Sequence, residues 1–222
     1  MNYVARIGAR VKRLPMKLAS VQWRRFPTKR DIVKETIRYA FGTGNLGNFL
    51  VASSDQGLVA VDFGGKGSSL VEPLAEALRK RFPEENVVKD AASMQGIADR
   101  VSELIHNPAS ESPIEVDLRG SEFEISVWKA LQKIPMGTMT TYGDLATEIG
   151  APGRAQDVGA ACAANTIAVV VPCHRVVRKD GTIAGYRWGI PRKLMLIERE
   201  QRALGFSLTY TPVDFKNGGR DH

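Results

Sequence analysis

Cysteine and histidine are scarce in this chain, which has two cysteines and three histidines among 222 residues. Two cysteines cannot form the disulfide framework of a small secreted domain, so we expect a reducing compartment, with the cytoplasm as the default. The histidines, His106, His174 and His222, are dispersed and lack the ligand spacing of a zinc site. We therefore expect no metal site.

Long hydrophobic runs are also missing. No apolar stretch approaches the roughly 20 residues that a membrane-spanning helix needs, and the first apolar residues are scattered among Lys and Arg rather than gathered into a secretory signal. The hydrophobic fraction of 43% and the charged fraction of 25% are ordinary for a soluble globular protein. The length allows one large domain or two small ones, with no membrane partner.

Acidic residues are almost absent from the start of the chain. Residues 1–34 hold ten Lys or Arg against one acid, Asp31, and we interpret them as a flexible basic arm. Three uses stay open for it: a solvated tail, added DNA affinity through counterion release, or an organelle transit peptide. Farther along, residues 151–200 hold eight bases against four acids. A phosphate backbone would meet the folded part there.

The first half of the folded part, residues 35–116, has the pattern of a scaffold. Short β-branched and aromatic runs separated by Gly-rich and Ser-Asp turns predict an antiparallel meander, at 36–41, 47–54 and 57–64. Apolar residues at helical spacing predict two helices, near 70–81 and 94–107. The segment "IEVDLRG" at 114–120 predicts one more strand. This half has no cluster of potential catalytic groups.

The second half, residues 117–206, is predicted to be helical, with a tail at 207–222. "SEFE", from Ser121 to Glu124, is a capping box that opens a helix. Next, "TYGDLATEIG", "APG" and "RAQDVGAACAAN" follow the order of a helix-turn-helix, whose second helix normally meets DNA. Many helical hairpins share this spacing, so a tightly packed interior helix is the alternative.

The stretch "VVVPCHRVVRKDG" places Cys173 beside His174. A thiol has a pKa near 8.5 and the thiolate is the nucleophile, so activation needs a base. Adjacent residues on extended backbone point opposite ways, so this pair needs a turn, which Pro172 favours, or a bridging water. Glu198 and Glu200 are both candidates for the carboxylate that orients the imidazole. The alternative is a core strand that ends in polar residues. Cys162, among alanines, is interpreted as a small packing residue.

Four motifs, "PCHRVV", "DGTIAGYRWG", "TYGDLA" and "ACAAN", closely resemble those of the O6-alkylguanine-DNA alkyltransferases. The resemblance runs from Ile37 to Glu200 and is best to the repair half of the bacterial adaptive-response proteins. It implies an α+β fold, with a small RNase H-like β-sheet domain at 35–116. A helical, winged-helix or helix-turn-helix-like domain that binds the minor groove follows at 117–206.

The resemblance also implies the chemistry. The alkyl group of a flipped-out O6-alkylguanine in double-stranded DNA would be transferred to Cys173 without a cofactor; whether O4-alkylthymine is accepted stays open. The thioether product makes us expect that the transfer is irreversible and that a monomer, used once, suffices. By this resemblance, His174 would act on the Cys173 sulfur through a water, and Glu200 would orient His174. Tyr142 would assist the leaving guanine and contact a DNA phosphate, and Asn165 would buttress the site.

Further site residues follow from the same resemblance. We expect DNA contacts from Arg154, Gln156, Arg175 and Tyr142. We expect an alkyl pocket from Pro172, Tyr186 and Trp188, with ordinary packing as the alternative for the two aromatic residues.

The chain departs from the family at one position. Relatives carry an arginine that replaces the flipped base in the stack, where this sequence has Gln156 followed by Asp157. Arg154 lies about 200° away on an ideal helix and cannot substitute unless the helix start shifts. We therefore expect less efficient base flipping.

Two other function classes compete with alkyl transfer. One is a non-enzymatic DNA-damage binding or regulatory module, although binding modules of this kind lack the cysteine that this chain has. The other is a Cys-His hydrolase, for which no oxyanion site is recognisable. The cysteine-rich zinc half and the regulator half of the adaptive-response proteins are absent, so transcriptional activation is not expected.

Overall fold

The computed structural model describes residues 34–64, 72–110, 113–183 and 185–205. The basic arm predicted for 1–34, apart from Lys34, lies outside these residues, and so does the tail predicted for 207–222. From Lys34 onward the described residues form a single compact unit by their contacts. The division into domains at 35–116 and 117–206 therefore stays a prediction.

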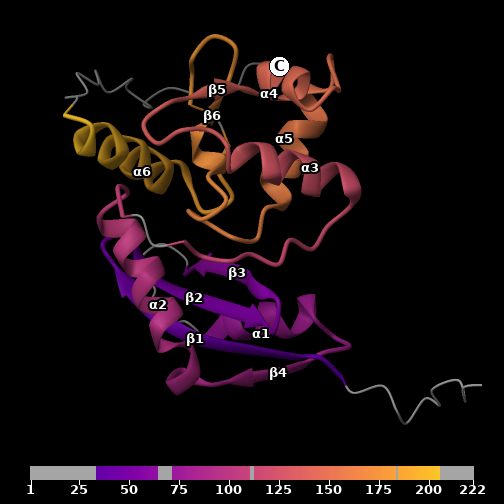
Figure 1. Ribbon diagram of the computed structural model, residues 1–222, viewed down its shortest axis with the longest axis vertical. Coiled ribbons are helices and arrows are strands. Elements are labelled where there is room, and N and C mark those ends of the chain that lie inside the picture. Colours follow the sequence, from indigo (N-terminus) through magenta and orange to yellow (C-terminus); the bar gives the residue numbers. More distant parts are fainter. Residues whose placement is uncertain (1–33, 65–71, 111–112, 184, 206–222) are drawn as a thin grey trace, which may run out of the picture. The chain divides into compact units, whose positions relative to one another are not determined.

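A four-stranded sheet has the order β3-β2-β1-β4 (Figure 1). The predicted antiparallel meander is confirmed, as β1 (Thr36–Gly44), β2 (Gly47–Ser54) and β3 (Gly57–Phe63). A strand that the sequence pattern missed, β4 (Asn86–Lys89), pairs in parallel with β1. The strand β3 is left at the edge of this sheet, where its backbone can pair with other segments.

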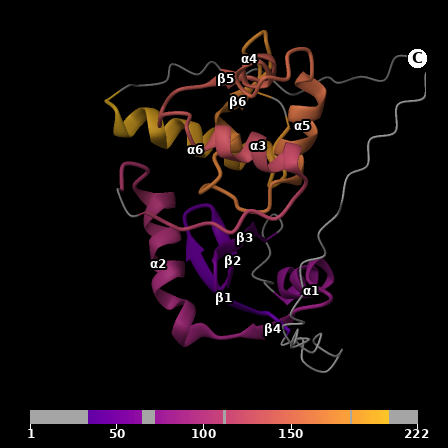
Figure 2. The same cartoon turned by 45° about the vertical axis from the view of Figure 1, so that its right-hand side comes forward.

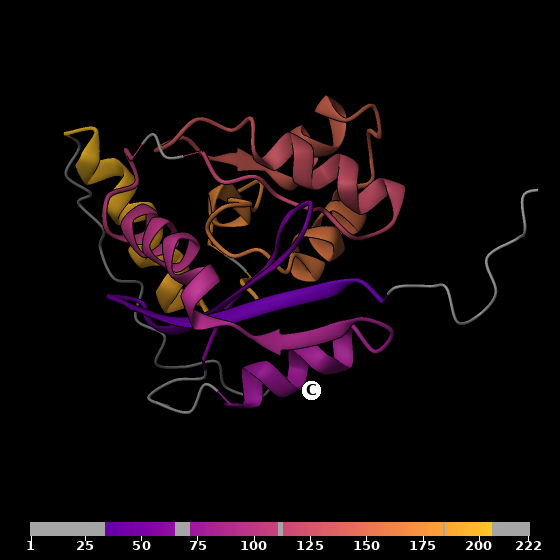
Figure 3. The ribbon, with the colours of Figure 1, turned by 60° about the horizontal axis from the view of Figure 1, so that its bottom comes forward.

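Both faces of the sheet are buried, which explains the nearly continuous apolar run in β2. One face packs on α1 (Glu72–Arg81), and the other packs on α2 (Ala91–His106) and on the C-terminal half of the chain (Figure 3). Val51 and Val61, on the second face, share one core cluster with residues of the C-terminal helices. The sheet therefore directly supports the second half of the chain.

The segment predicted as a strand at 114–120 is mostly an extended linker, which corrects that prediction. Only Val116 forms a bridge, in parallel with Leu58 of β3. The chain passes so close to Gly57 that a Cβ there would lie 2.9 Å from the Glu115 carbonyl oxygen. Beyond the bridge, ion pairs to the side chain of Arg119 replace strand pairing.

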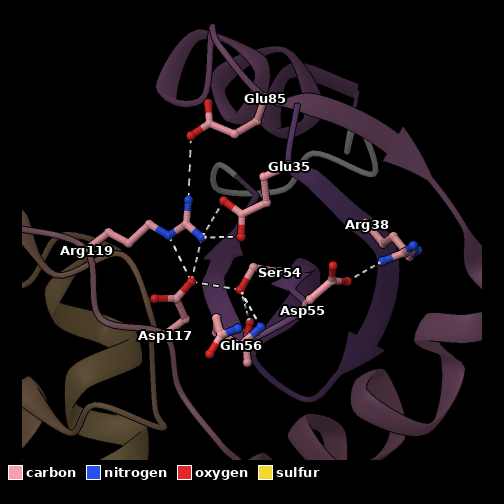
Figure 4. A network of polar contacts seen from close by, with 9 residues as sticks. Glu35, Arg38, Ser54, Asp55, Gln56, Glu85, Asp117 and Arg119 are labelled. Carbon is pink, nitrogen blue, oxygen red and sulfur yellow. Dashed lines mark hydrogen bonds and ion pairs between the residues drawn. The ribbon is translucent and has the colours of Figure 1, made fainter. Parts of the chain in front are cut away.

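Figure 4 shows these ion pairs. The Arg119 guanidinium contacts Glu35, Glu85 and Asp117, and Asp117 also accepts a hydrogen bond of 2.7 Å from the Ser54 hydroxyl. Because these partners lie near the start of β1, at the end of β2 and before β4, the linker is fastened to the sheet just before the helical half begins.

The helical half packs beside the sheet (Figure 2). Its elements are α3 (Glu122–Leu131), β5 (Thr140–Thr141), α4 (Tyr142–Glu148), α5 (Ala155–Ala164), the 3-10 turn η1 (Cys173–Arg175), β6 (Val176–Val177) and α6 (Ile190–Ala203). The predicted capping box is confirmed: Ser121 Oγ accepts from the Glu124 amide, and the Glu124 carboxylate accepts from the Ser121 amide. The predicted α+β class is confirmed. None of the helices described here is long and apolar enough to cross a membrane.

Candidate active site

The segment that leads to Cys173 is anchored on the edge strand β3. The Val61 amide donates to the Thr166 carbonyl at 2.9 Å, and the Ala168 amide donates to the Val61 carbonyl at 3.1 Å. Val169 then takes a φ of 68°, a left-handed conformation that is costly for a β-branched residue. The Val170 amide closes this tight turn on the Ala168 carbonyl at 2.7 Å. The chain is thus held firmly as it approaches the cysteine.

Cys173 is buried, with 4% of its surface exposed, and it opens the turn η1. The buried Asn165 amide donates to the Cys173 sulfur at 3.3 Å and to the Val171 carbonyl at 2.9 Å. The Asn165 side-chain oxygen accepts from the Ile167 amide at 2.9 Å, which fixes the amide orientation. A donor aimed at the sulfur stabilises its anionic form.

Electrostatic forces on the Cys173 thiol oppose one another. Burial raises its pKa to about 11, while the Asn165 hydrogen bond and the positive charge of Lys193 work in the opposite direction. Lys193 is fully buried and its ammonium donates to the carbonyls of Val176 at 2.6 Å and Gly185 at 3.3 Å. The resting sulfur is therefore a neutral thiol, and it needs a base at neutral pH.

His174 is oriented to serve as that base. The turn η1, which Pro172 favoured, lets its ring reach α6, where Nε2 lies 2.7 Å from Glu200 Oε1. With the Nε2 proton donated to this carboxylate, Nδ1 is the acceptor, and it is buried without a hydrogen-bond partner among the described residues. Burial lowers the pKa of His174, so the imidazole is neutral at pH 7.

Glu200, rather than the alternative Glu198, is the carboxylate at this site. It accepts hydrogen bonds from His174, from Arg175 and, at 2.9 Å, from the Gly137 amide. Burial works to raise the pKa of Glu200, but the hydrogen bonds from His174 and Arg175 and the positive charge of Arg175 outweigh it and hold that pKa at about 2. Glu200 therefore stays ionised and does not take the proton from His174. Glu198 pairs with Arg202 on the exposed side of α6.

Arg175, from which we predicted a DNA contact, turns toward Glu200 in this structure. Its guanidinium donates to both oxygens of Glu200 and to the Ile134 carbonyl, and only 15% of the side chain is exposed. The guanidinium is therefore already paired with a buried carboxylate. Arg175 positions Glu200 instead.

A pocket of about 270 Å³ opens onto the sulfur. Its lining comes from α4, α5, η1 and the loop before α6, and consists of Tyr142, Gly159, Cys162, Ala163, Cys173, Gly185, Tyr186 and Arg187. Tyr186 is there as predicted. Pro172 and Trp188 do not line this pocket: Trp188 lies behind Tyr186, with ring centroids 5.1 Å apart, and its Nε1 is bound to Asp62.

Sequence reasoning missed the contribution of α5 to this pocket. Gly159, Cys162 and Ala163 are three and four residues apart, so they share one helix face, and this spacing was the available signal. Cys162 is packed in the hydrophobic core, as predicted, and it also lines this pocket together with Cys173. Burial raises the pKa of its thiol strongly, so it stays protonated.

Comparison with known proteins decides the family. The inducible methylated-DNA–protein-cysteine methyltransferase of Bacillus subtilis is 37% identical over 156 residues, which cover 70% of this chain and 86% of that protein. This chain belongs to the methylated-DNA–protein-cysteine methyltransferases. Residues 122–202 match the family model described as 6-O-methylguanine DNA methyltransferase, DNA binding domain. The bifunctional transcriptional activator/DNA repair enzyme Ada of Escherichia coli is 39% identical over 165 residues, but the chain spans only 45% of its length.

Solved structures of this methyltransferase family have the same fold. The O6-methylguanine methyltransferase of Mycobacterium tuberculosis aligns with a TM-score of 0.62 at 32% identity, over 75% of this chain and 94% of that one. The Mycobacterium tuberculosis protein in complex with DNA aligns with a TM-score of 0.61 at 32% identity, over 76% and 94% of the two chains.

The helix-turn-helix of this family member carries the remaining predicted residues. Helix α5 begins at Ala155, so Arg154 is its N-cap rather than a helical residue, and the exposed Gln156 is in the first turn. The Arg154 guanidinium lies 4.1 Å from the centre of the Phe123 ring and pairs with Asp157 at 2.7 Å. Arg154 is thus already engaged, two positions before the exposed Gln156.

Tyr142 links this motif to the pocket. It is the first residue of α4 and lines the pocket together with Cys173. Burial, followed by the two nearby cysteines, raises the pKa of its phenol to about 12. The phenol therefore keeps its proton at neutral pH and can donate it to an anion that forms in the pocket.

Proposed function

We propose that this chain repairs O6-alkylguanine in double-stranded DNA by transferring the alkyl group irreversibly to Cys173 after base flipping. The observation that carries this proposal is a pocket lined by the buried Cys173 thiol, next to which the ionised Glu200 carboxylate orients the His174 imidazole. The target carbon lies inside the duplex, so the base must be extruded, which costs a few kcal/mol. A pocket of about 270 Å³ is a suitable receptor for the extruded group.

The proposed step conserves atoms and charge. His174 Nδ1 takes the thiol proton through a water, and the sulfur attacks the alkyl carbon as the bond from that carbon to O6 breaks. The electron pair goes to guanine, and the Tyr142 phenol supplies the proton that neutralises it. The imidazolium proton then replaces that of Tyr142 through solvent. The nucleophile is a side chain of the protein, so no cofactor is required.

The same chemistry limits each molecule to one event. The product is a thioether, and no group that lines the pocket is placed to cleave it. A protein consumed by its reaction acts as a stoichiometric reagent. A monomer suffices for this chemistry.

DNA is the proposed partner, approached from the minor-groove side. The small residues of α5 permit close approach of a backbone, which suits a minor groove better than base reading in the major groove. The complex of the Mycobacterium tuberculosis protein with DNA supports a DNA partner. Arg154, Gln156 and Tyr142 are the proposed contacts; Arg154 would have to leave Asp157 to reach a phosphate.

A duplex that carries one O6-methylguanine labelled on its methyl group tests the function. We expect the label to move to the protein and the base to return to guanine. A damage-binding module would retain the label in the DNA, and a hydrolase would release it to solvent. Either of these outcomes would reject the proposal.

Gln156→Arg is expected to speed repair of duplex DNA. An arginine in the exposed first turn of α5 adds a positive charge and a planar group that can stack where the flipped base was. We expect the single-turnover rate on methylated duplex to rise by about tenfold. The control is the same lesion in a single strand, where no base pair must open and the rate should not change. An unchanged duplex rate would reject the hypothesis that Gln156 limits flipping.

A further inference from the structure

A buried carboxylate of the sheet reaches the wall of the pocket. Asp62, on the edge strand β3, is 7% exposed. Its Oδ1 accepts from Trp188 Nε1 at 2.9 Å, and its Oδ2 accepts from an Arg81 guanidinium nitrogen at 2.9 Å. Asp62 and Trp188 are 126 residues apart in sequence. A side chain of the scaffold half therefore holds the loop that follows the cysteine.

Aromatic contacts connect Trp188, through Tyr186, to the His174 ring. The Trp188 and Tyr186 rings meet edge to face with centroids 5.1 Å apart, and the Tyr186 and His174 rings do so at 6.5 Å. The Tyr186 hydroxyl is buried and has no hydrogen-bond partner in the described part of the chain. Packing therefore keeps Tyr186 in the pocket wall, and Trp188 provides that packing from behind.

The charge of Asp62 is difficult to explain by folding alone. Burying a carboxylate is unfavourable unless its partners compensate, and an apolar residue would fill the same place in a strand without that cost. Arg81 supplies a compensating charge, and Arg187, another pocket residue, has its Nε 3.8 Å from Oδ1. The contacts of Asp62 therefore include two neighbours of Tyr186 in the loop, Arg187 and Trp188.

The backbone next to Asp62 makes β3 a rigid support. Val61 pairs with the segment from Thr166 to Ala168, which precedes Cys173. The strand thus holds the cysteine segment through its backbone and the opposite loop through the Asp62 side chain. The distance between the sulfur and the Tyr186 wall depends on both attachments.

We propose that Asp62 is a positioning residue that, through Trp188 and Tyr186, limits the size of the alkyl group that Cys173 accepts. This inference rests on the proposed alkyl transfer. Without the carboxylate, the Trp188 ring can rotate and Tyr186 can move back, which widens the pocket. Small alkyl groups then lose part of their orientation, while large ones gain room.

The test compares rate constants for O6-methylguanine and O6-benzylguanine in the same duplex. Asp62→Ala is expected to shift the benzyl-to-methyl ratio of rate constants by about tenfold in favour of benzyl, the size of effect that one charge-assisted hydrogen bond can exert. Trp188→Phe, which keeps a ring but loses the N–H donor, is expected to shift the ratio in the same direction. In the double variant the two effects should not add, because both break one contact.

Three further variants separate positioning from stability. Asp62→Asn loses the ion pair with Arg81 but keeps an oxygen that accepts from the indole N–H. Its benzyl-to-methyl ratio should therefore be closer to that of the wild type than the ratio of Asp62→Ala is. Arg81→Gln should lower the Tm and leave the ratio unchanged. Asp55→Asn, which removes an exposed pair with Arg38 on the same sheet, should change neither.

The outcomes are distinct. An unchanged ratio in both Asp62→Ala and Trp188→Phe would overturn the inference and make Asp62 a residue of stability only. If Asp62→Ala does not fold, Trp188→Phe alone decides. If the wild type transfers no methyl group to Cys173, the proposed function itself fails, and this is seen before any ratio is measured.

Discussion

Cys173→Ala is expected to bind methylated duplex DNA as the wild type does but to remove no methyl group. The substitution deletes the nucleophile and leaves the pocket wall, the recognition helix and the surface of α5 in place. Because the side chain is buried beneath the pocket, its loss should not change the DNA contacts. Binding is checked by fluorescence anisotropy with lesion duplex, and transfer by the labelled-methyl assay on the same samples.

Cys162→Ala is the matched control. It also removes a buried sulfur from the pocket wall, yet it should still take up one methyl group per chain, because the acceptor Cys173 remains in place and burial raises the pKa of the thiol that is removed. Methylation of Cys162 in the Cys173→Ala protein, or lesion loss with that protein, would show that Cys173 is not the acceptor.

His174→Ala is expected to slow transfer on the order of 10²–10³-fold at pH 7, the usual contribution of a positioned general base. Burial lowers the pKa of His174, so in the wild type the base is unprotonated at neutral pH. The wild-type rate should therefore be flat above pH 7 and fall only in acid, below the ordinary histidine pKa of about 6.5, as the ring takes up a proton.

The variant should depend on pH in a different way. Without the imidazole the thiol must ionise alone, and burial raises its pKa to about 11. Its rate should therefore rise about tenfold per pH unit from neutral pH toward that value. Parallel pH profiles for wild type and variant would contradict the role of His174. Glu200→Gln is a poorer test, because it also leaves the buried Arg175 guanidinium without its charge partner.

Local features of this chain were predictable from its sequence because local interactions set them. The capping box at Ser121, the three strands of the meander and the turn between α4 and α5 follow from side-chain spacing and from glycine and proline placement. The turn η1 at Cys173 is one of the two arrangements, a turn or a bridging water, that adjacent Cys and His left open. The strand β4 was missed because four residues, "NVVK", carry too little pattern.

The direction of long side chains was not predictable. Arg175 follows a buried histidine, and its sequence position fits an outward side chain as well as an inward one. Only the placement of Glu200 on α6 shows that it turns inward. Trp188 was expected in the pocket wall but lies one layer behind, because its partner Asp62 comes from a distant strand. Contacts between residues this far apart depend on the packing of the sheet against the helical half, which no local pattern encodes.

Mass spectrometry of the protein after titration with O6-methylguanine duplex is the most direct measurement. We expect one methyl group per chain on the peptide that contains Cys173, with uptake that stops at one lesion per protein however much DNA is added. Unmodified protein alongside restored guanine, or one chain that clears several lesions, would contradict irreversible transfer to this sulfur.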